Sequence, residues 1–132
     1  MEKAYDIMRW DFLKAVMGRF DFADKFMEMV VGCICKPSFA VFVNGSLTNR
    51  FQSTMGLQQC DPLSPYLFVL GAEVLTRLMK IEQGRGRLSG FPFGNGQGIV
   101  GHLLYVDDCL MVARATSMEE KLVGEVFKTI VQ

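Results

Sequence analysis

The sequence predicts an α+β fold, with an antiparallel sheet backed by helices, in a single domain covering residues 1–132. Asn44-Gly45 lies between two β-type runs and is the strongest short signal for a hairpin. Asp107-Asp108 lies between two apolar runs, 99–104 and 109–113, and predicts the tip of a second hairpin. Four segments with helical spacing complete the order ααββαββα.

The first half of the chain is expected to hold two helices and one hairpin. Asp6 can cap a helix over 7–20, because its side chain can accept a hydrogen bond from a free N–H group of the first turn. A second apolar-rich segment, 22–34, is also typical of a helix. Strands over 38–43 and 47–52 then flank the Asn-Gly turn.

The second half is expected to begin with a long helix, capped by Asp61 or Ser64. The glycine-rich segment 83–98 predicts a loop with a short strand inside it. Ser117 with Glu120 forms a capping box before a last helix. Apolar residues at steps of three and four predict the buried side of the long helix: Leu63, Leu67, Leu70, Val74, Leu78 and Ile81.

Composition limits the classes of function. Half of the residues are hydrophobic, including 11 Phe and 9 Met, which is enough for a core, and the formal net charge is zero. A chain that grips phosphates by itself is usually basic, so strong autonomous nucleic-acid binding is not expected. No apolar run approaches the roughly 18 residues needed to cross a membrane, and no signal peptide is expected. We therefore expect an intracellular protein without membrane contact, in the nucleus or the cytoplasm.

The cysteines and the single histidine favour structural roles. Cys33-Ile34-Cys35 has no second pair at the spacing of zinc ligands, so we interpret the four cysteines as small buried side chains in a reducing compartment. His102 lies in an apolar strand, where a histidine with a structural hydrogen bond is the simpler interpretation than a ligand or base.

Asp107 and Asp108 are the candidate metal-binding residues. Two carboxylates held close together repel, which raises a pKa unless a cation neutralises them, and a hard divalent cation suits such oxygen ligands. The alternative is a solvated turn with two exposed acids.

Three segments of the chain together resemble the palm motifs of a reverse transcriptase. They are Lys3-Ala4-Tyr5-Asp6 followed by Trp10, the run from Gly56 to Phe68 with the sequence GLQQCDPLSPYLF, and Tyr105-Val106-Asp107-Asp108. Their order and spacing are similar to those of non-LTR (LINE-type) retrotransposon enzymes of plants, and the resemblance covers nearly the whole chain. It implies a partial polymerase palm domain, in which the Tyr-x-Asp-Asp hairpin belongs to an antiparallel sheet packed on helices.

The resemblance also implies a chemistry. The family is an RNA-directed DNA polymerase, a nucleotidyltransferase of transposable elements, whose two metal ions serve nucleotidyl transfer to a primer 3′-hydroxyl. Asp107 matches its metal ligand and catalytic residue, and Asp108 is the partner carboxylate; the cofactor would be Mg²⁺, with Mn²⁺ possible. Tyr5, Gln59 and Tyr105 match nucleotide-binding positions. RNA template, DNA primer and deoxynucleoside triphosphate are the partners of the intact enzyme.

Several positions depart from the family pattern. The family's first motif, Asp-x-x-Lys-Ala-[Phe/Tyr]-Asp, would place its metal-binding aspartate one position before Met1. The family loop reads Gly-x-Arg-Gln-Gly-Asp-Pro, whereas this chain has Gln58 for the arginine and Cys60 for the second glycine. Glycine there permits either a close approach of the backbone or a positive φ, so a cysteine should crowd the nucleotide or strain the loop. Glutamine in place of arginine removes a cation near the phosphates.

Two hypotheses follow from these motifs and departures. The first is a palm fragment of a reverse transcriptase without fingers, thumb or endonuclease, which is expected to bind little nucleic acid and to extend no primer by itself. The second is a non-catalytic retroelement relic, acting as an inert or binding module. A third interpretation is a plain α+β domain with an Asp-Asp turn.

Overall fold

A computed structural model describes residues 4–95, 98–105 and 108–131. Within these ranges the chain forms four helices and eight short strands, all paired antiparallel, which confirms the predicted α+β class. The chain divides into two compact units, one of residues Tyr5–Phe68 and the other of the chain from Val69 onward together with Ala4. Each unit is described separately below.

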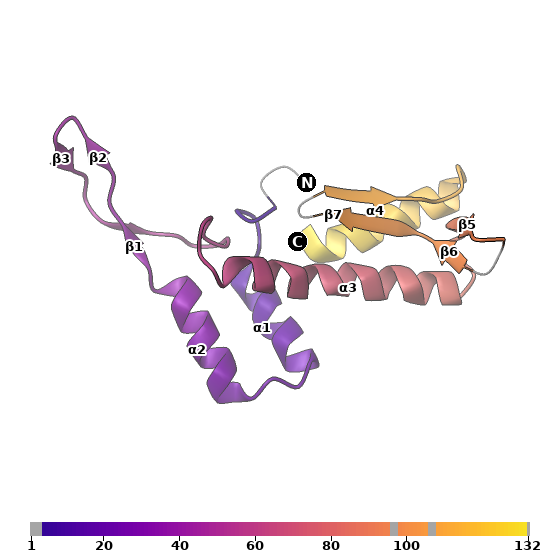
Figure 1. The fold of residues 1–132 in the computed structure, drawn as a ribbon, viewed down its shortest axis with the longest axis horizontal. Helices are drawn as coiled ribbons and strands as arrows, with labels where there is room; N and C mark the ends of the chain where they lie inside the picture. The colour runs from indigo at the N-terminus through magenta and orange to yellow at the C-terminus, as the bar shows by residue number, and fades with distance from the viewer. Residues whose placement is uncertain (1–3, 96–97, 106–107, 132) are drawn as a thin grey trace. The chain divides into compact units, whose positions relative to one another are not determined.

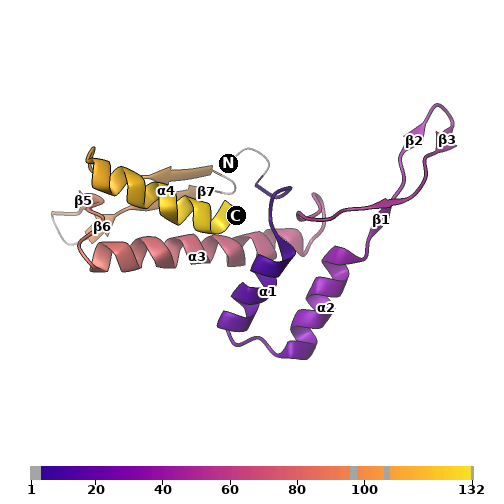
Figure 2. The same cartoon turned by 180° about the vertical axis from the view of Figure 1, so that it is seen from behind.

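The first unit is built on two helices, α1 (Trp10–Arg19) and α2 (Asp24–Cys35), which pack side by side (Figures 1 and 2). Apolar residues at steps of three and four line the contact, as the helical period requires. The buried side chains of the pair are Leu13, Val16, Met17, Met27 and Val30. The predicted helices therefore exist, although both are shorter at their N-terminal ends than the sequence suggested.

Asp6 does not cap α1, so this prediction is wrong. The helix begins at Trp10, its N-cap residue is Arg9, and no side chain makes the capping hydrogen bond. The carbonyl groups of Tyr5 and Met8 accept hydrogen bonds from a loop distant in sequence. Because those residues bond to the loop, the chain enters the helix three residues later than expected.

The predicted hairpin follows α2 as an extended two-stranded arm. β1 (Ser38–Phe39) pairs with β4 (Phe51–Gln52), and β2 (Phe42–Val43) pairs with β3 (Ser46–Leu47). Both turn residues have positive φ, 48° at Asn44 and 83° at Gly45, which is the pattern of a type I′ turn. The Asn-Gly prediction is confirmed.

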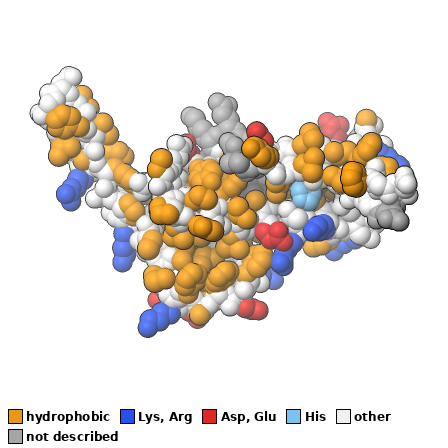
Figure 3. Space-filling view, viewed as in Figure 1, with side chains coloured by type: hydrophobic (Ala, Val, Ile, Leu, Met, Phe, Trp, Pro, Cys, Tyr) orange, Lys and Arg blue, Asp and Glu red, His pale blue; other side chains and the backbone are white. Residues whose placement is uncertain are grey.

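The arm leaves many apolar side chains open to solvent (Figure 3). Phe42 and Leu47 are each 69% exposed, because a two-stranded ribbon has no layer packed against it. Val41, Val43 and Phe51 are also exposed.

The long helix α3 (Ser64–Gly84) begins in the first unit and continues in the second. Its start is stabilised by Asp61, whose Oδ1 accepts a hydrogen bond of 2.9 Å from the backbone N–H of Leu63. Ser64 does not cap it: the Ser64 Oγ atom is buried and makes no hydrogen bond in the described structure. Of the two predicted caps, Asp61 is therefore the one that acts.

The predicted buried stripe of α3 is confirmed in part. Leu67 is buried and Leu78 packs against the core cluster, whereas Ile81 is exposed. The most deeply buried apolar residues of the helix are Leu75 and Met79, which the stripe did not include. Apolar residues occur on both sides of the expected stripe, so the period alone could not choose between them. The packing partners decide: the core cluster joins Leu75 and Met79 to Leu88 and Val126.

In the second unit, two hairpins and one helix accompany α3 (Figure 1). β5 (Phe91–Phe93) pairs with β6 (Gly98–Val100), β7 (His102–Tyr105) pairs with β8 (Asp108–Met111), and α4 (Ser117–Val131) closes the chain. β5 is the short strand expected in the glycine-rich loop. The strand pairs of the described residues remain separate two-stranded ladders and do not join into one larger sheet.

The side-chain cap of α4 lies one residue before its predicted place. The Thr116 Oγ1 accepts a hydrogen bond from the backbone N–H of Glu119 at 3.3 Å, whereas the Thr116 N–H donates to the Arg114 carbonyl and not to Glu119, so the reciprocal bond of a capping box is not made. The Glu119 carboxylate accepts three further hydrogen bonds, from the N–H and hydroxyl of Ser89 and from the N–H of Arg114. These bonds hold the carboxylate inward, which a helix-start pattern alone does not reveal.

None of the helices within the described ranges combines the length and the apolar character that crossing a membrane would need.

Candidate functional site

The loop around Gly56 is bonded directly to the segment that carries Tyr5. The Gly56 N–H donates to the Met8 carbonyl at 2.8 Å, and the Leu57 N–H donates to the Tyr5 carbonyl at 2.7 Å. The Trp10 indole N–H donates to the Gly56 carbonyl at 2.8 Å, across 46 positions of sequence. Two of the three segments that carry the family resemblance are thus brought together by the fold.

Only glycine fits at position 56. Its φ is +89°, in the left-handed region, and a Cβ built there would lie 2.7 Å from the backbone oxygen of Asp6. Both the conformation and the close approach exclude a side chain. The contact between the loop and the Tyr5 segment therefore depends on this residue.

The next residues form a tight turn with a cysteine at its critical position. The Asp61 N–H lies 3.4 Å from the Gln58 carbonyl, and Cys60, at the third position of this turn, has φ +68°. A positive φ at the third position is typical of a type II turn, which favours glycine there. This is the position where the pattern that the chain resembles has glycine, and of the two expected reasons for a glycine the structure shows a positive φ.

Cys60 differs from the other described non-glycine residues with positive φ. Those are Asp21, Asn44 and Asn95, whose short polar side chains tolerate the left-handed conformation. Cysteine has no such compensation, and the Cys60 side chain is exposed, so packing does not offset the strain. Cys60 is a strained residue in the candidate nucleotide loop.

A cavity of about 380 Å³ lies within the first unit, between the loop, the end of α2 and the base of the arm. Four polar residues are among those that line it: Asp6, Gln58, Gln59 and Asp61. The rest of the described wall is mostly apolar and contains no lysine or arginine: Cys33, Ile34, Pro37, Phe39, Phe51, Ser53, Met55, Gly56 and Leu57. The lining residues therefore include two acids and no base that could pair with a phosphate.

Tyr5 has a packing role in the structure. Its ring stacks on Phe68 of α3, with the ring centroids 4.7 Å apart and the planes inclined by 10°. Phe68 is buried and Tyr5 is half-buried, so the pair joins the first segment to the beginning of the long helix. Gln59, by contrast, is exposed at the cavity wall.

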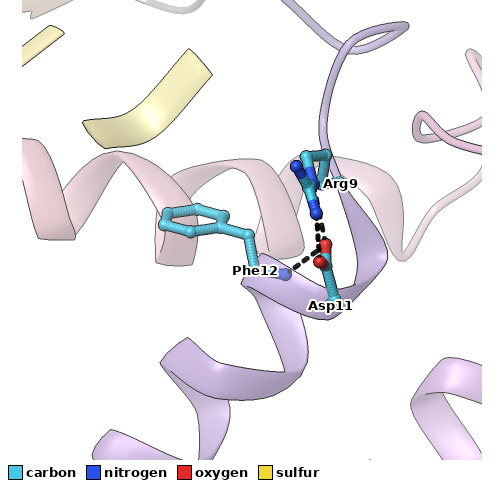
Figure 4. A network of polar contacts seen from close by, with 3 residues as sticks. All are labelled: Arg9, Asp11 and Phe12. Atoms are coloured by element: carbon cyan, nitrogen blue, oxygen red, sulfur yellow. Dashed lines mark hydrogen bonds and ion pairs between the residues drawn. The ribbon is translucent and has the colours of Figure 1, made fainter. Parts of the chain in front are cut away.

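The start of α1 is held by a separate polar network, shown in Figure 4. The Asp11 Oδ1 accepts hydrogen bonds from the Phe12 N–H at 2.9 Å and from the Arg9 Nε at 3.0 Å, and a second Arg9 nitrogen contacts the other carboxylate oxygen. The hydrogen bond from Arg9 lowers the pKa of Asp11 below its usual value. Both side chains are exposed, so the pair orients the first turn and adds little to stability.

Tyr105 and Asp108 face each other across the second predicted hairpin. They form the last described pair of the β7–β8 ladder, and Val106 and Asp107 lie outside the described residues. Tyr105 is 79% exposed and Asp108 is also exposed. The prediction that Asp108 belongs to a β-hairpin is confirmed, whereas the position of Asp107, including its separation from Tyr5, is a prediction on which the described residues do not bear.

The hairpin has one face toward the core and one toward solvent. Cys109 and Met111 pack against the core cluster, while Leu103 and Leu110, which are directly opposite each other, are 57% and 59% exposed. Because side chains alternate along a strand, Asp108 lies on the same open face as Leu110. The carboxylate is therefore presented to solvent.

Metal binding stays a prediction, because Asp107, one of the two expected ligands, lies outside the described residues. Among them, no group of three His, Cys, Asp or Glu side chains is arranged to hold a metal ion. Asp108 offers one carboxylate, and Mg²⁺ needs further oxygen ligands, of which Asp107 is the expected one.

His102 and Glu119 make structural hydrogen bonds within the second unit. The His102 Nε2 lies 3.0 Å from the Thr76 hydroxyl, as expected for a structural histidine, and burial lowers the pKa of the ring. The hydrogen bond from Ser89 lowers the pKa of Glu119. Sequence reasoning missed Glu119, although the Thr-x-x-Glu spacing that begins at Thr116 could have indicated it.

No protein-family model matches the chain. The chain is 40% identical over 75 residues to a curated protein of Arabidopsis thaliana named "Uncharacterized mitochondrial protein AtMg01250". The matched region is 57% of this chain and 62% of that protein, so the chain covers less than two thirds of the relative's length.

Proposed function

We propose that the chain is part of the palm domain of an RNA-directed DNA polymerase, of the kind found in non-LTR retrotransposons. The observation that carries the proposal is the bonding of the Gly56 loop to the Tyr5 segment. In such a polymerase, the loop with Gln59 would lie along the incoming nucleotide, and Tyr5 would limit access of a 2′-hydroxyl. The similar protein is from a plant, as are the retrotransposons that the motifs resemble, and its name states no activity.

The second unit carries a proposed site of its own, the Tyr105–Asp108 hairpin. Asp107 and Asp108 are the carboxylates that would hold Mg²⁺, or Mn²⁺ in its place, and the metal would supply charge stabilisation for nucleotidyl transfer. Asp108 is exposed at the start of β8, which is compatible with that role. Tyr105 beside it would contact the nucleotide or primer.

The deciding experiment is primer extension by an active non-LTR reverse transcriptase in which residues 4–131 of this chain replace the equivalent palm segment. We expect RNA-templated extension from the hybrid that carries Cys60→Gly, and loss of extension when Asp107→Asn is added. Asp24→Asn, at an acid in the first turn of α2, is the matched control and should leave extension unchanged. Extension that survives Asp107→Asn would contradict the assigned role of this residue.

The non-catalytic relic is favoured by specific observations of its own. Cys60 is strained at the position where the family has glycine, and the described wall of the adjacent cavity contains no basic side chain. A folded hybrid with Cys60→Gly that still extends no primer would support the relic and contradict the enzyme. Equal extension with and without Cys60→Gly would remove the argument for a relic.

A further inference from the structure

Trp10 connects the start of α1 to the candidate nucleotide loop. It is the single tryptophan of the chain and the first residue of the helix. Its indole N–H donates to the Gly56 carbonyl at 2.8 Å, in a partly buried place. A tryptophan N–H that leaves water normally finds such an acceptor, so the bond fixes the direction of the ring as well as that of the loop.

Gly56 is consequently held from two sides. Its carbonyl accepts from Trp10, and its own N–H donates to Met8. One residue further, the Leu57 N–H donates to the Tyr5 carbonyl. These bonds hold the backbone at Gly56 and Leu57. Gln58 and Gln59 follow directly in sequence, so their starting position is held as well.

The residue that donates is itself held in place. Asp11 accepts from the N–H of Phe12 and from Arg9, which flank Trp10 on both sides in sequence (Figure 4). These bonds orient the first turn of α1, which carries the indole. A shift of the ring would be transmitted to Gly56 through the hydrogen bond between the indole N–H and the Gly56 carbonyl.

We propose that Trp10 is a positioning residue for nucleotide selection, a role that rests on the proposed function. By holding the Gly56 carbonyl, its indole N–H fixes how far the candidate nucleotide loop, which carries Gln59, lies from Tyr5. In the proposed site that distance decides whether a ribose 2′-hydroxyl fits beside the tyrosine ring. Trp10 touches no substrate and acts through Gly56.

The test removes the N–H and keeps the ring. Because the chain has one tryptophan, 3-benzothienylalanine, which replaces the indole N–H by sulfur, can be introduced at position 10 alone. Trp10→Phe is the second variant. Phe22→Leu, at a partly exposed ring of the same unit that stacks on Phe26, is the matched control.

Two measurements are made on the 132-residue chain. Amide hydrogen exchange reports on the N–H groups of Gly56 and Leu57, and mass spectrometry of the Cys60 peptide reports how fast its exposed thiol is alkylated. Discrimination against the 2′-hydroxyl is measured separately, on the hybrid polymerase that carries Cys60→Gly, with and without Trp10→Phe. It is the ratio of the rates at which dGTP and GTP extend the primer.

We expect exchange at Gly56 and Leu57 to accelerate by a factor of about two to ten in both Trp10 variants, the range that one net hydrogen bond corresponds to. Discrimination against GTP should fall by a similar factor, and the control should change neither quantity. Unchanged exchange, or faster exchange with unchanged discrimination, would overturn the positioning role. Failure of the folded hybrid to extend a primer with either nucleotide would instead overturn the proposed function, while exchange would still show whether Trp10 holds Gly56.

Discussion

Cys60→Gly removes a Cβ from a turn position whose backbone favours glycine. With φ at +68°, cysteine at this position costs roughly 1–2 kcal/mol relative to a residue without a Cβ. Glycine also gives the unfolded chain more freedom, which offsets about 0.4–1 kcal/mol of that gain. Because the thiol is exposed, little packing is lost. The net expectation is a stabilisation of about 0.5–1 kcal/mol, by the difference of these two effects.

The assay is thermal and urea unfolding of the reduced protein, followed by circular dichroism. For a chain of 132 residues, the expected gain raises the midpoint temperature by about 2–4 °C. Cys60→Ala is the matched control: it removes the sulfur and keeps the Cβ, so its unfolding free energy should stay within about 0.5 kcal/mol of the original. Cys60→Asn should stabilise, because asparagine tolerates the left-handed conformation.

Two results would refute the reasoning about Cys60. If Cys60→Gly destabilises, glycine's unfolded-state entropy outweighs the strain and the turn does not need a residue without Cβ. If Cys60→Ala stabilises as much as Cys60→Gly, the cost lies in the sulfur and not in the backbone. Either result would also remove the structural reason for the glycine that the family has there.

Three further predictions concern the fold and the metal. Gly56→Ala should lower the unfolding free energy by more than about 2 kcal/mol, while Gly18→Ala, inside α1 with open space around it, should raise it by about 0.5–1 kcal/mol; urea unfolding checks both. Since the folded pKa of Glu119 lies below its ordinary 4.5, its stabilisation is present above that pH and is lost as the pH falls through the folded value, so Glu119→Gln should flatten the acid side of the midpoint-temperature profile. An equally steep profile in that variant would contradict this. Mn²⁺ should bind weakly and broaden the NMR signals of Asp108, and Asp107→Asn should abolish the effect; tight stoichiometric binding in calorimetry that survives the substitution would be the opposite result.

Local signals in the sequence predicted the elements well where one residue type decides the backbone. Asn44-Gly45 gave the hairpin, because a type I′ turn needs two positive φ angles that few other pairs adopt. Glycine in the resembled pattern at the position of Cys60 likewise indicated a close backbone approach or a positive φ, and the structure shows the latter. Such signals depend on the conformation of one or two residues and need no knowledge of the rest of the fold.

Predictions that depended on distant partners were less accurate. Asp6 was expected to cap α1, but the neighbouring Tyr5 and Met8 carbonyls bond to the loop 56–57, which the local pattern could not reveal. The buried side of α3 was predicted only in part, because Leu88 and Val126, far along the chain, pack on Leu75 and Met79, which the predicted stripe did not include. In both cases tertiary contacts chose between locally acceptable arrangements.

Positions 56 and 60 of the loop distinguish what the fold needs from what catalysis would need. The resembled family has glycine at both, and this chain has Gly56 and Cys60. Gly56 is required by the fold itself, since a Cβ would meet the Asp6 backbone at 2.7 Å. Position 60 is exposed, and a cysteine there costs only the strain of a positive φ, which a stable domain can tolerate. Under the proposed origin, glycine stands where folding demands it and is replaced where a nucleotide would approach. That combination is expected of a palm whose folding is maintained more strictly than its activity. It explains why restoring glycine at position 60 tests the relic hypothesis more directly than any change at Gly56.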